Sequence, residues 1–557
     1  MTDTTPAALQ LADFCATFEK DTVDKVQSRL LDPSFSNETL RQGLQEMRER
    51  MERSVQLLGN LENQCPPVGR FSDELILNIL RYCMDEAHSE WTDDDPLEFP
   101  GAFSLCWKWR NVVIHSPSLW SRLRLPVKRN LLELFIERSA NIPLEIEVDN
   151  WDRNNRPEDM QDCEGVEAFC NTFLQLLPRV SHLHLEWNDG QGADNDLRYK
   201  IVHLMGLEEL TSLKSLEITD WNEDSDDLPD FIIDTPALTK FVFGGDSAHM
   251  PQVSRNVTDF DCDCADLGPR EMLALLSRHP QLEILDISNA DPPAYVERGT
   301  YSVVSLPKLK SLCVRSFLPT DMNDLIKNLH IPSWRTMRLS IFLDESAALN
   351  HPQGEWGIEE FLGHRLFSFD GIIFFQKASR FNFYYTLTTK SGQEMHVKFK
   401  VTPGPRTPIA SLSKLSSYPN TLTSVTFDIP KLPTTFDLTQ ALSSWSNITC
   451  IQVRTEKTHF VRLLKVLEQE PEIICPLLEV FDCNGTVFQS SRLGRFLRFR
   501  KRCGKPLHQL RVGFGVLDTS TMHKFQALVG EVDEVQTLPQ PSYRDMKVWG
   551  ELRELYG

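Results

Sequence analysis

The chain has 557 residues and a formal net charge of −21, with 58 lysines and arginines against 79 aspartates and glutamates. A chain of this length exceeds one hydrophobic core, which predicts several domains, or a short domain followed by an extended array. The negative charge argues against non-specific binding to nucleic acid and to anionic membranes, because both need a positive field.

The chain shows no targeting or membrane-spanning pattern. Residues 1–11 lack the basic and apolar regions of a secretory signal. No window approaches the roughly 18 unbroken apolar residues of a spanning helix. We therefore expect a cytoplasmic or nuclear protein, or one found in both places, and we expect its 13 cysteines to be reduced thiols.

A short phrase with three apolar positions recurs along most of the chain. In one copy it reads Leu213-Lys-Ser-Leu216-Glu-Ile218, and in another Leu282-Glu-Ile-Leu285-Asp-Ile287. The copies begin at residues 178, 211, 236, 255, 280, 307, 332, 420, 446, 476 and 505. Alternation in a strand sends the second and third apolar side chains to one face. Three buried side chains contribute about 5–9 kcal/mol gross, less than the cost of ordering a whole repeat. The copies must therefore stack side by side.

The phrase and the helical segments between its copies resemble the leucine-rich repeat, over roughly Leu176 to Phe514. This resemblance implies an α/β fold in which strands and helical returns form a curved solenoid. The stretch 340–419 departs from the pattern. Residues 380–401 predict two strands around Ser391 and Gly392, which is an inserted β-hairpin. Leu366 and Phe369 mark a degenerate copy just before it.

An apolar stripe runs along a polar segment near the N-terminus, over Asn37 to Asn63. Its members are Leu40, Leu44, Met47, Met51, Leu58 and Leu61. Their spacings of three, four and seven predict an amphipathic helix. Such a helix could form a coiled-coil dimer or dock on its own chain, and both readings stay open.

A second set of phrases follows this helix. Phe71-Ser-Asp-Glu-Leu75 opens a helical pattern that Ser72 or Asp73 can cap. Downstream stand Cys106-Trp-Lys-Trp109-Arg110 and Ser116-Pro-Ser-Leu-Trp120. These phrases resemble the F-box over about Val68 to Leu125, although Ser72 replaces the usual proline and the acidic connector 85–98 is longer than in compact members. The whole order resembles fungal, basidiomycete-type F-box proteins with leucine-rich repeats.

The resemblance implies a substrate-recognition adaptor of a cullin–RING, SCF-type ubiquitin ligase. Its F-box would bind the Skp-family adaptor, which joins the cullin, and its repeats would bind a protein substrate. The alternative is a non-catalytic repeat scaffold whose F-box no longer engages the ligase. The residues expected to bind the adaptor are Phe71, Glu74, Leu75, Ile79, Leu80, Trp109 and Trp120. The same side chains could instead pack only in the module's own core.

The outward strand positions of the repeats gather charge. Counting along the phrases places there Asp259, Asp261, Asp263, Asp286, Arg315 and Arg338. An acidic patch is therefore expected beside a basic one, and we predict that a basic segment of a substrate meets the aspartates. The alternative is a solvated face. A second basic run, residues 492–505, fits either an anion or partner site or a solvated helical face.

No pattern of catalytic or metal chemistry stands out. His182-x-His184 and Cys262-x-Cys264 lack further ligands at suitable spacing, and we find no phosphate-binding loop or nucleophile motif. We expect no enzyme activity, no metal and no cofactor. The predicted segments are an N-terminal helix region (1–64), an F-box-like domain (65–126), the repeats (127–515) and a C-terminal cap or tail (516–557).

Overall fold

The computed structural model describes most of the chain from residue 71 onward. The described residues are scattered positions within 20–28 and 38–55, and then 71–90, 107–125, 127, 129–148, 163–187, 195–220, 232–246, 250–265, 267–289, 301–343, 362–363, 365–376, 382–401, 412–418, 420–470 and 472–536. Within Asn37 to Asn63 the described positions are helical and Leu44 is exposed. The other members of the predicted stripe, and the residues after 536, lie outside the described residues.

Contacts divide the chain into two compact units. Unit 1 comprises Met1–Arg122 and Arg129–Ile142, and unit 2 comprises Leu123–Lys128 and Pro143–Gly557. Residues 129–142, which we predicted as the start of the repeats, thus group with the F-box-like segment.

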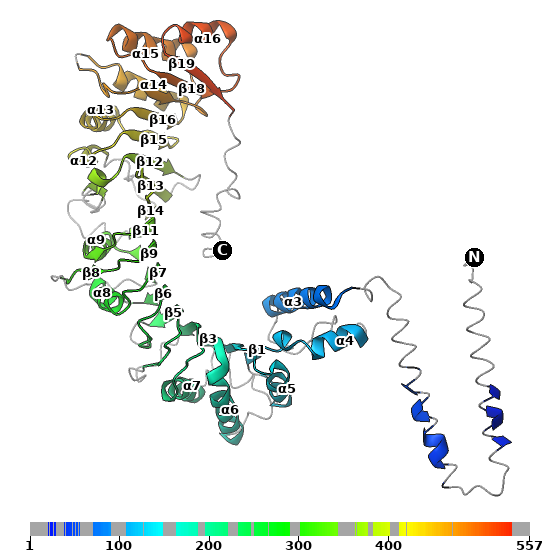
Figure 1. The fold of residues 1–557 in the computed structure, drawn as a ribbon. Helices are drawn as coiled ribbons and strands as arrows, with labels where there is room; N and C mark the ends of the chain where they lie inside the picture. The colour runs from blue at the N-terminus through cyan, green and yellow to red at the C-terminus, as the bar shows by residue number, and fades with distance from the viewer. Residues whose placement is uncertain are drawn as a thin grey trace. The chain divides into compact units, whose positions relative to one another are not determined.

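Unit 1 contains a group of helices (Figure 1). Their buried apolar side chains, such as Ile76, Leu80 and Trp109, form a small core. The helices are α3 (Asp73–Glu90), α4 (Trp107–Ile114), η3 (Pro117–Leu119) and α5 (Arg129–Ser139). The Ser72 hydroxyl accepts a hydrogen bond from the Leu75 amide at 3.3 Å, so the predicted helix cap is confirmed. No helix among the described residues of either unit is long and apolar enough to cross a bilayer.

Unit 2 is built on a large, mostly parallel sheet with helices on one side of it, so the predicted mixed α/β class is confirmed (Figure 1). Its 17 strands are β1 (Arg122–Leu125), β2 (Leu144–Val148), β3 (Val180–Trp187), β4 (Ser215–Asp220), β5 (Lys240–Asp246), β6 (Asp259–Ala265), β7 (Ile284–Asn289), β9 (Ser311–Phe317), β11 (Thr336–Leu343), β12 (Gly371–Gln376), β13 (Asn382–Thr388), β14 (Glu394–Val401), β15 (Ser424–Asp428), β16 (Cys450–Arg454), β17 (Val480–Asp482), β18 (Gln509–Gly513) and β19 (Glu531–Val535).

The connections between these strands are largely helical. They contain α6 (Cys163–Leu176), η6 (Leu177–Arg179), α7 (Asn195–Leu207), α8 (Pro269–Ser277), α9 (Pro319–Lys327), η8 (Leu366–Ser368), α12 (Leu412–Leu415), α13 (Thr435–Ser444), α14 (Lys457–Leu467), α15 (Ser490–Arg502) and α16 (Thr519–Gln526). The short strands β8 (Val304–Ser305) and β10 (Leu329–His330) form a separate parallel pair. Where a connection is helical, it lets the next strand run parallel to the one before it.

Each recurring phrase lies on a strand, and neighbouring strands pair in register. The middle apolar residues of successive phrases are direct partners, as in Leu216↔Phe241 and Phe241↔Phe260. All three are at most 1% exposed, and the Phe241 and Phe260 rings stack at 5.4 Å. Stacking therefore buries a continuous apolar row that no single copy could bury.

The predicted hairpin is confirmed as β13 and β14, with Gly392 at φ +83° in the turn between them. Its position is unexpected. β14 pairs parallel with β11, β13 pairs antiparallel with both β14 and β12, and β12 pairs parallel with β15. The two hairpin strands thus sit inside the sheet. A degenerate copy is present, with Phe369, Ile372 and Phe374 buried at the spacing of the phrase, whereas the predicted member Leu366 lies before it in η8.

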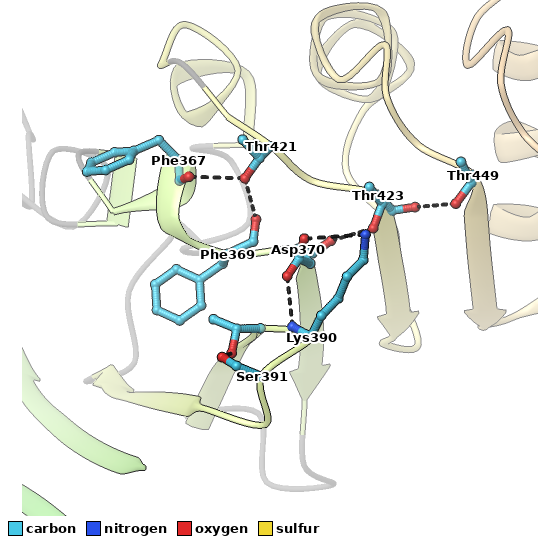
Figure 2. A network of polar contacts seen from close by, with 9 residues as sticks. Phe367, Phe369, Asp370, Lys390, Ser391, Thr421, Thr423 and Thr449 are labelled. Atoms are coloured by element: carbon cyan, nitrogen blue, oxygen red, sulfur yellow. Dashed lines mark hydrogen bonds and ion pairs between the residues drawn. The ribbon is translucent and has the colours of Figure 1, made fainter. Parts of the chain in front are cut away.

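Asp370, just before β12, forms hydrogen bonds both to the hairpin turn and to the segment that leads into β15 (Figure 2). Its carboxylate accepts the Lys390 amide at 2.8 Å. Its carbonyl accepts the Thr423 amide at 2.7 Å and the Thr423 hydroxyl at 3.2 Å. Side chain and backbone of one residue therefore fix both the turn and the strand that follows.

Hydroxyl side chains repeat this contact along the sheet. The side-chain hydroxyl of the residue after the first apolar position of a phrase donates to a backbone carbonyl at the start of the preceding strand, at 3.0–3.2 Å. The donors are Ser181, Thr239, Thr258, Thr423 and Thr449. In the four threonine cases the hydroxyl joins backbone amides that already donate to the same carbonyl, so each bond reinforces the register at the start of a strand.

Arg500 on α15 joins several backbone segments at the C-terminal end of unit 2. Its buried guanidinium donates to the carbonyls of Ile474, Cys475, Leu478 and Lys505 at 3.0–3.4 Å. Burial lowers the Arg500 pKa, yet the carbonyls compensate the charge. The sheet continues past residue 515 through β19.

We predict that Arg500→Met lowers the free energy of unfolding of this end by about 3 kcal/mol, since four carbonyls, three of them on the buried residues Ile474, Cys475 and Leu478, lose a donor. Arg498→Met is the matched control, because Arg498 is exposed on the same helix and should shift stability by no more than about 0.5 kcal/mol. Denaturant unfolding followed by circular dichroism measures both. Equal effects of the two substitutions would contradict the role given to Arg500.

Candidate functional site

The first candidate surface lies on α3 of unit 1. The hydrogen bond of the Trp120 indole to the Val113 carbonyl, at 2.7 Å, closes the end of α4. Trp120 also meets the Phe135 ring at 5.2 Å, and the Arg138 guanidinium lies 4.5 Å above its ring centre. The Lys108 ammonium binds the Phe71 carbonyl and lies 3.7 Å from the Asp73 carboxylate. These contacts hold α3, α4 and α5 together.

The residues expected to bind an adaptor fall into two groups. Leu80, Trp109 and Trp120 are at most 3% exposed, so they form the core of unit 1 and are not accessible to a partner in this packing. Phe71 and Ile79 are half-buried, while Glu74 and Leu75 are exposed. The sequence could not separate the groups, because both follow helical periodicity.

An exposed apolar stripe remains on unit 1. Leu75 is 44% exposed and Tyr82, two turns later on α3, is 79% exposed. Ile79 lies between them on the same helical face. Trp107, at the start of α4, is 56% exposed. Sequence reasoning did not select Tyr82 or Trp107 as site residues, although Trp107 lies within the Cys106–Arg110 phrase and Tyr82 follows Leu75 at helical spacing.

The second candidate surface is the outward face of the sheet in unit 2. Outward residues of neighbouring strands form a row across β6, β7, β9, β11 and β14, whose members are Asp261, Asp286, Cys313, Arg338 and His396. The predicted acidic and basic positions are therefore neighbours in one surface. His396, which the hairpin contributes, was not predicted.

Arg315 binds Asp286 closely. The Arg315 Nε and Nη2 atoms lie 3.0 and 2.9 Å from the Asp286 Oδ1 atom, and both side chains are largely buried. This pair joins β7 to β9 and neutralises one of the four predicted aspartates. Asp286 and Arg315 are thus tied to each other, and their part in binding a partner is limited.

Asp259, Asp261 and Asp263 occupy alternate positions of β6 on the outward face. Burial raises the pKa of Asp261 to about 6, and the nearby Asp286 carboxylate adds to the effect while Arg315 opposes it. Burial also raises the pKa of Asp259, against the pull of Lys240. The Asp263 Oδ1 atom is buried and has no hydrogen-bond partner among the described residues. Three crowded carboxylates can accept a cationic side chain, which would relieve their repulsion.

On the other side of the Asp286–Arg315 pair, the outward residues are Arg338 and His396 in place of aspartates. His396 lies 3.1 Å from the Thr386 hydroxyl and 3.3 Å from the Glu394 carboxylate. Burial lowers the His396 pKa, the Glu394 carboxylate opposes this shift, and Arg338 adds to it. The imidazole of His396 therefore lies between the charges of Glu394 and Arg338.

Metal-ligating groups do not gather in the described part of the chain, where no cluster of three or more His, Cys, Asp or Glu side chains is arranged to hold a metal ion. His182 and His184 instead lie near Glu145 and Glu217, at 4.0 and 3.9 Å. Cys262 and Cys264 are buried with their sulfurs 3.1 Å apart.

Comparison with models of known protein families gave no match to this chain, and comparison with curated proteins gave no significant match. The class that the fold itself defines is a mixed α/β chain with a large, mostly parallel sheet and a separate helical unit.

We predict that Asp261→Asn alters the pH dependence of stability. Folding raises the Asp261 pKa from 3.8 to about 6, so the folded state binds more protons between these values and the free energy of unfolding falls as pH rises through them. Asparagine does not titrate, so the substitution removes the contribution of residue 261 to this fall in stability. The variant's advantage over the wild type should grow from near zero below about pH 4 to its full value above about pH 6.

Denaturant unfolding of both proteins across this pH range measures the difference. A constant difference between the variant and the wild type would contradict the raised pKa.

Proposed function

We propose that this chain is a substrate-recognition adaptor of a cullin–RING, SCF-type ubiquitin ligase. In this proposal unit 1 is an F-box-like module that binds a Skp-family adaptor and, through it, a cullin. Unit 2 is a leucine-rich-repeat solenoid that binds a protein substrate. The observation that carries the proposal is that residues resembling the F-box fold into a helical module whose helix α3 keeps Leu75 and Tyr82 in solvent.

The apolar stripe supports the adaptor-binding role. Exposed apolar side chains in a row on one helix are typical of a surface that another protein covers. Burying one leucine side chain contributes about 1.5–3 kcal/mol, so a few such residues are enough for a specific contact. Glu74, exposed on the first turn of α3, adds a charge beside Leu75.

The role we propose is positioning, not chemistry. A scaffold that binds a ligase at one site and a substrate at another raises the concentration of the substrate near the conjugating enzyme. The outward surface of β6 supports the substrate-binding part, because Asp259, Asp261 and Asp263 lie at alternate positions of one strand and a basic side chain would relieve the repulsion between their carboxylates.

A second candidate function is a repeat scaffold that no longer engages a ligase. The observation that favours it is Ser72, which stands where the F-box family usually has a proline. Ser72 caps α3 through its side chain. The start of the helix is therefore kept, but a proline side chain is not available at this position to contact an adaptor. Adaptor binding separates the two candidates.

We predict that the full chain binds a purified Skp-family adaptor and that Leu75→Asp weakens this binding at least about tenfold, because a charge replaces an apolar contact. Isothermal calorimetry measures the affinity. Leu207→Asp is the matched control, since Leu207 is 60% exposed in unit 2 and should leave adaptor binding unchanged. An unaltered affinity of Leu75→Asp, or no binding by the wild type, would contradict the proposal.

We also predict that Asp259→Lys combined with Asp261→Lys reduces recovery of basic substrates from a cell extract by about tenfold, through repulsion in place of attraction. Asp286 is left intact because it holds Arg315. Quantitative mass spectrometry of the purified complexes measures substrates and adaptor together. Adaptor recovery should stay constant, and Glu208→Lys with Glu271→Lys, both exposed outside β6, serves as the control. Unchanged recovery of basic substrates would count against this surface.

A further inference from the structure

Helix α15, near the C-terminal end of the sheet, is strongly basic in an acidic chain. It packs between α14 and α16 in the group of helices at that end (Figure 1). Its residues Ser490–Arg502 include no acidic side chain. Its basic residues are Arg492, Arg495, Arg498, Arg500, Lys501 and Arg502.

Two of these cations serve the fold. Arg500 is buried among backbone carbonyls. Arg492 donates two hydrogen bonds to the Glu468 carboxylate on the segment after α14, at 2.5 and 2.7 Å, and both side chains are nearly buried. This bidentate pair satisfies both Glu468 oxygens.

The other arginines of α15 keep their charge in solvent. The Arg495 side chain is 75% exposed and reaches only to 3.8 Å from Glu468, which Arg492 already neutralises. The Arg502 side chain is 71% exposed, and its partner Glu470 is 65% exposed, so this pair contributes little. Arg498 is exposed and forms no ion pair with any described residue.

Position along the helix places these three charges on one stripe. Arg495, Arg498 and Arg502 follow each other at three and four residues, so neighbouring charges lie about one helical turn apart. Lys501 donates to the Ala527 carbonyl at 2.7 Å, and the exposed Lys505 and Lys524 extend the positive surface toward α16. The stripe is about 10 Å long at 1.5 Å rise per residue.

We propose that this stripe, defined by Arg495, Arg498 and Arg502, binds a short carboxylate-rich segment of a partner polypeptide. An extended peptide presents alternate side chains about 6.6–7 Å apart, close to the distance between arginines one turn apart, and a guanidinium pairs with a carboxylate through two parallel bonds. This inference is independent of the proposed ligase role, because it uses neither α3 nor the outward strand face.

The negative charge of the whole chain favours binding of a short peptide at this stripe over binding of a larger anion. Nucleic acid or an anionic membrane would extend beyond a 10 Å stripe and meet a protein with a net charge of −21. A peptide segment stays within reach of the stripe, since charges farther than a Debye length of about 8 Å are screened at physiological salt.

The test uses the full chain and a fluorescein-labelled peptide of alternating glutamate and serine, with fluorescence anisotropy as the readout. We expect binding that weakens as salt rises, and at least about a tenfold loss of affinity in the triple variant Arg495→Glu, Arg498→Glu, Arg502→Glu. All three side chains are exposed, so circular dichroism should show an unchanged fold.

A matched variant controls for net charge. Lys308→Glu, Lys327→Glu and Arg335→Glu change the charge by the same amount at exposed sites away from α15, and they should leave peptide affinity within about twofold. Equal loss in the two triple variants, no loss in the α15 variant, or tighter binding of a single-stranded oligonucleotide than of the peptide would overturn the proposal.

Discussion

The in-register pairing of parallel strands is the constraint on which unit 2 depends. Each strand buries only a few apolar side chains, and these are covered because the next strand places its own at the same height, as Phe241 does against Phe260. A slip of one residue would turn every buried side chain outward. Hydroxyl side chains such as those of Thr239 and Thr258 oppose that slip, because they donate to backbone carbonyls beside the preceding strand.

The inserted hairpin shows how strictly this constraint acts. β13 runs against its neighbours, yet the pair β13 and β14 fills the place between β11 and β12 with hydrogen bonds on both sides. The outward surface consequently continues from Asp261 through Arg338 to His396 without a break. Under our proposal, the insertion widens the surface that meets a substrate while it preserves the core.

Much of the fold follows from spacing in the sequence, whereas the candidate surfaces follow only partly. The positions of most strands could be predicted from the recurring phrase, and the position of the hairpin from the turn residues around Gly392. Periodicity could not tell that Leu80 faces the core while Leu75 faces solvent, because this depends on where α4 packs. Likewise, the Asp286–Arg315 pair depends on which strands are neighbours. The basic run of α15 was visible, but its division into a buried Arg500 and an exposed Arg498 required tertiary contacts.

Hydrogen–deuterium exchange of the backbone amides in β13 and β14 tests the central claim most directly, because the outward surface is continuous only if the hairpin lies within the sheet. Amides paired on both sides open only when neighbouring strands open with them. The structure predicts that β13 exchanges as slowly as β9 and β11, which also have partners on both sides. Exchange of β13 as fast as that of an isolated surface hairpin would contradict the continuous sheet and the surface built on it.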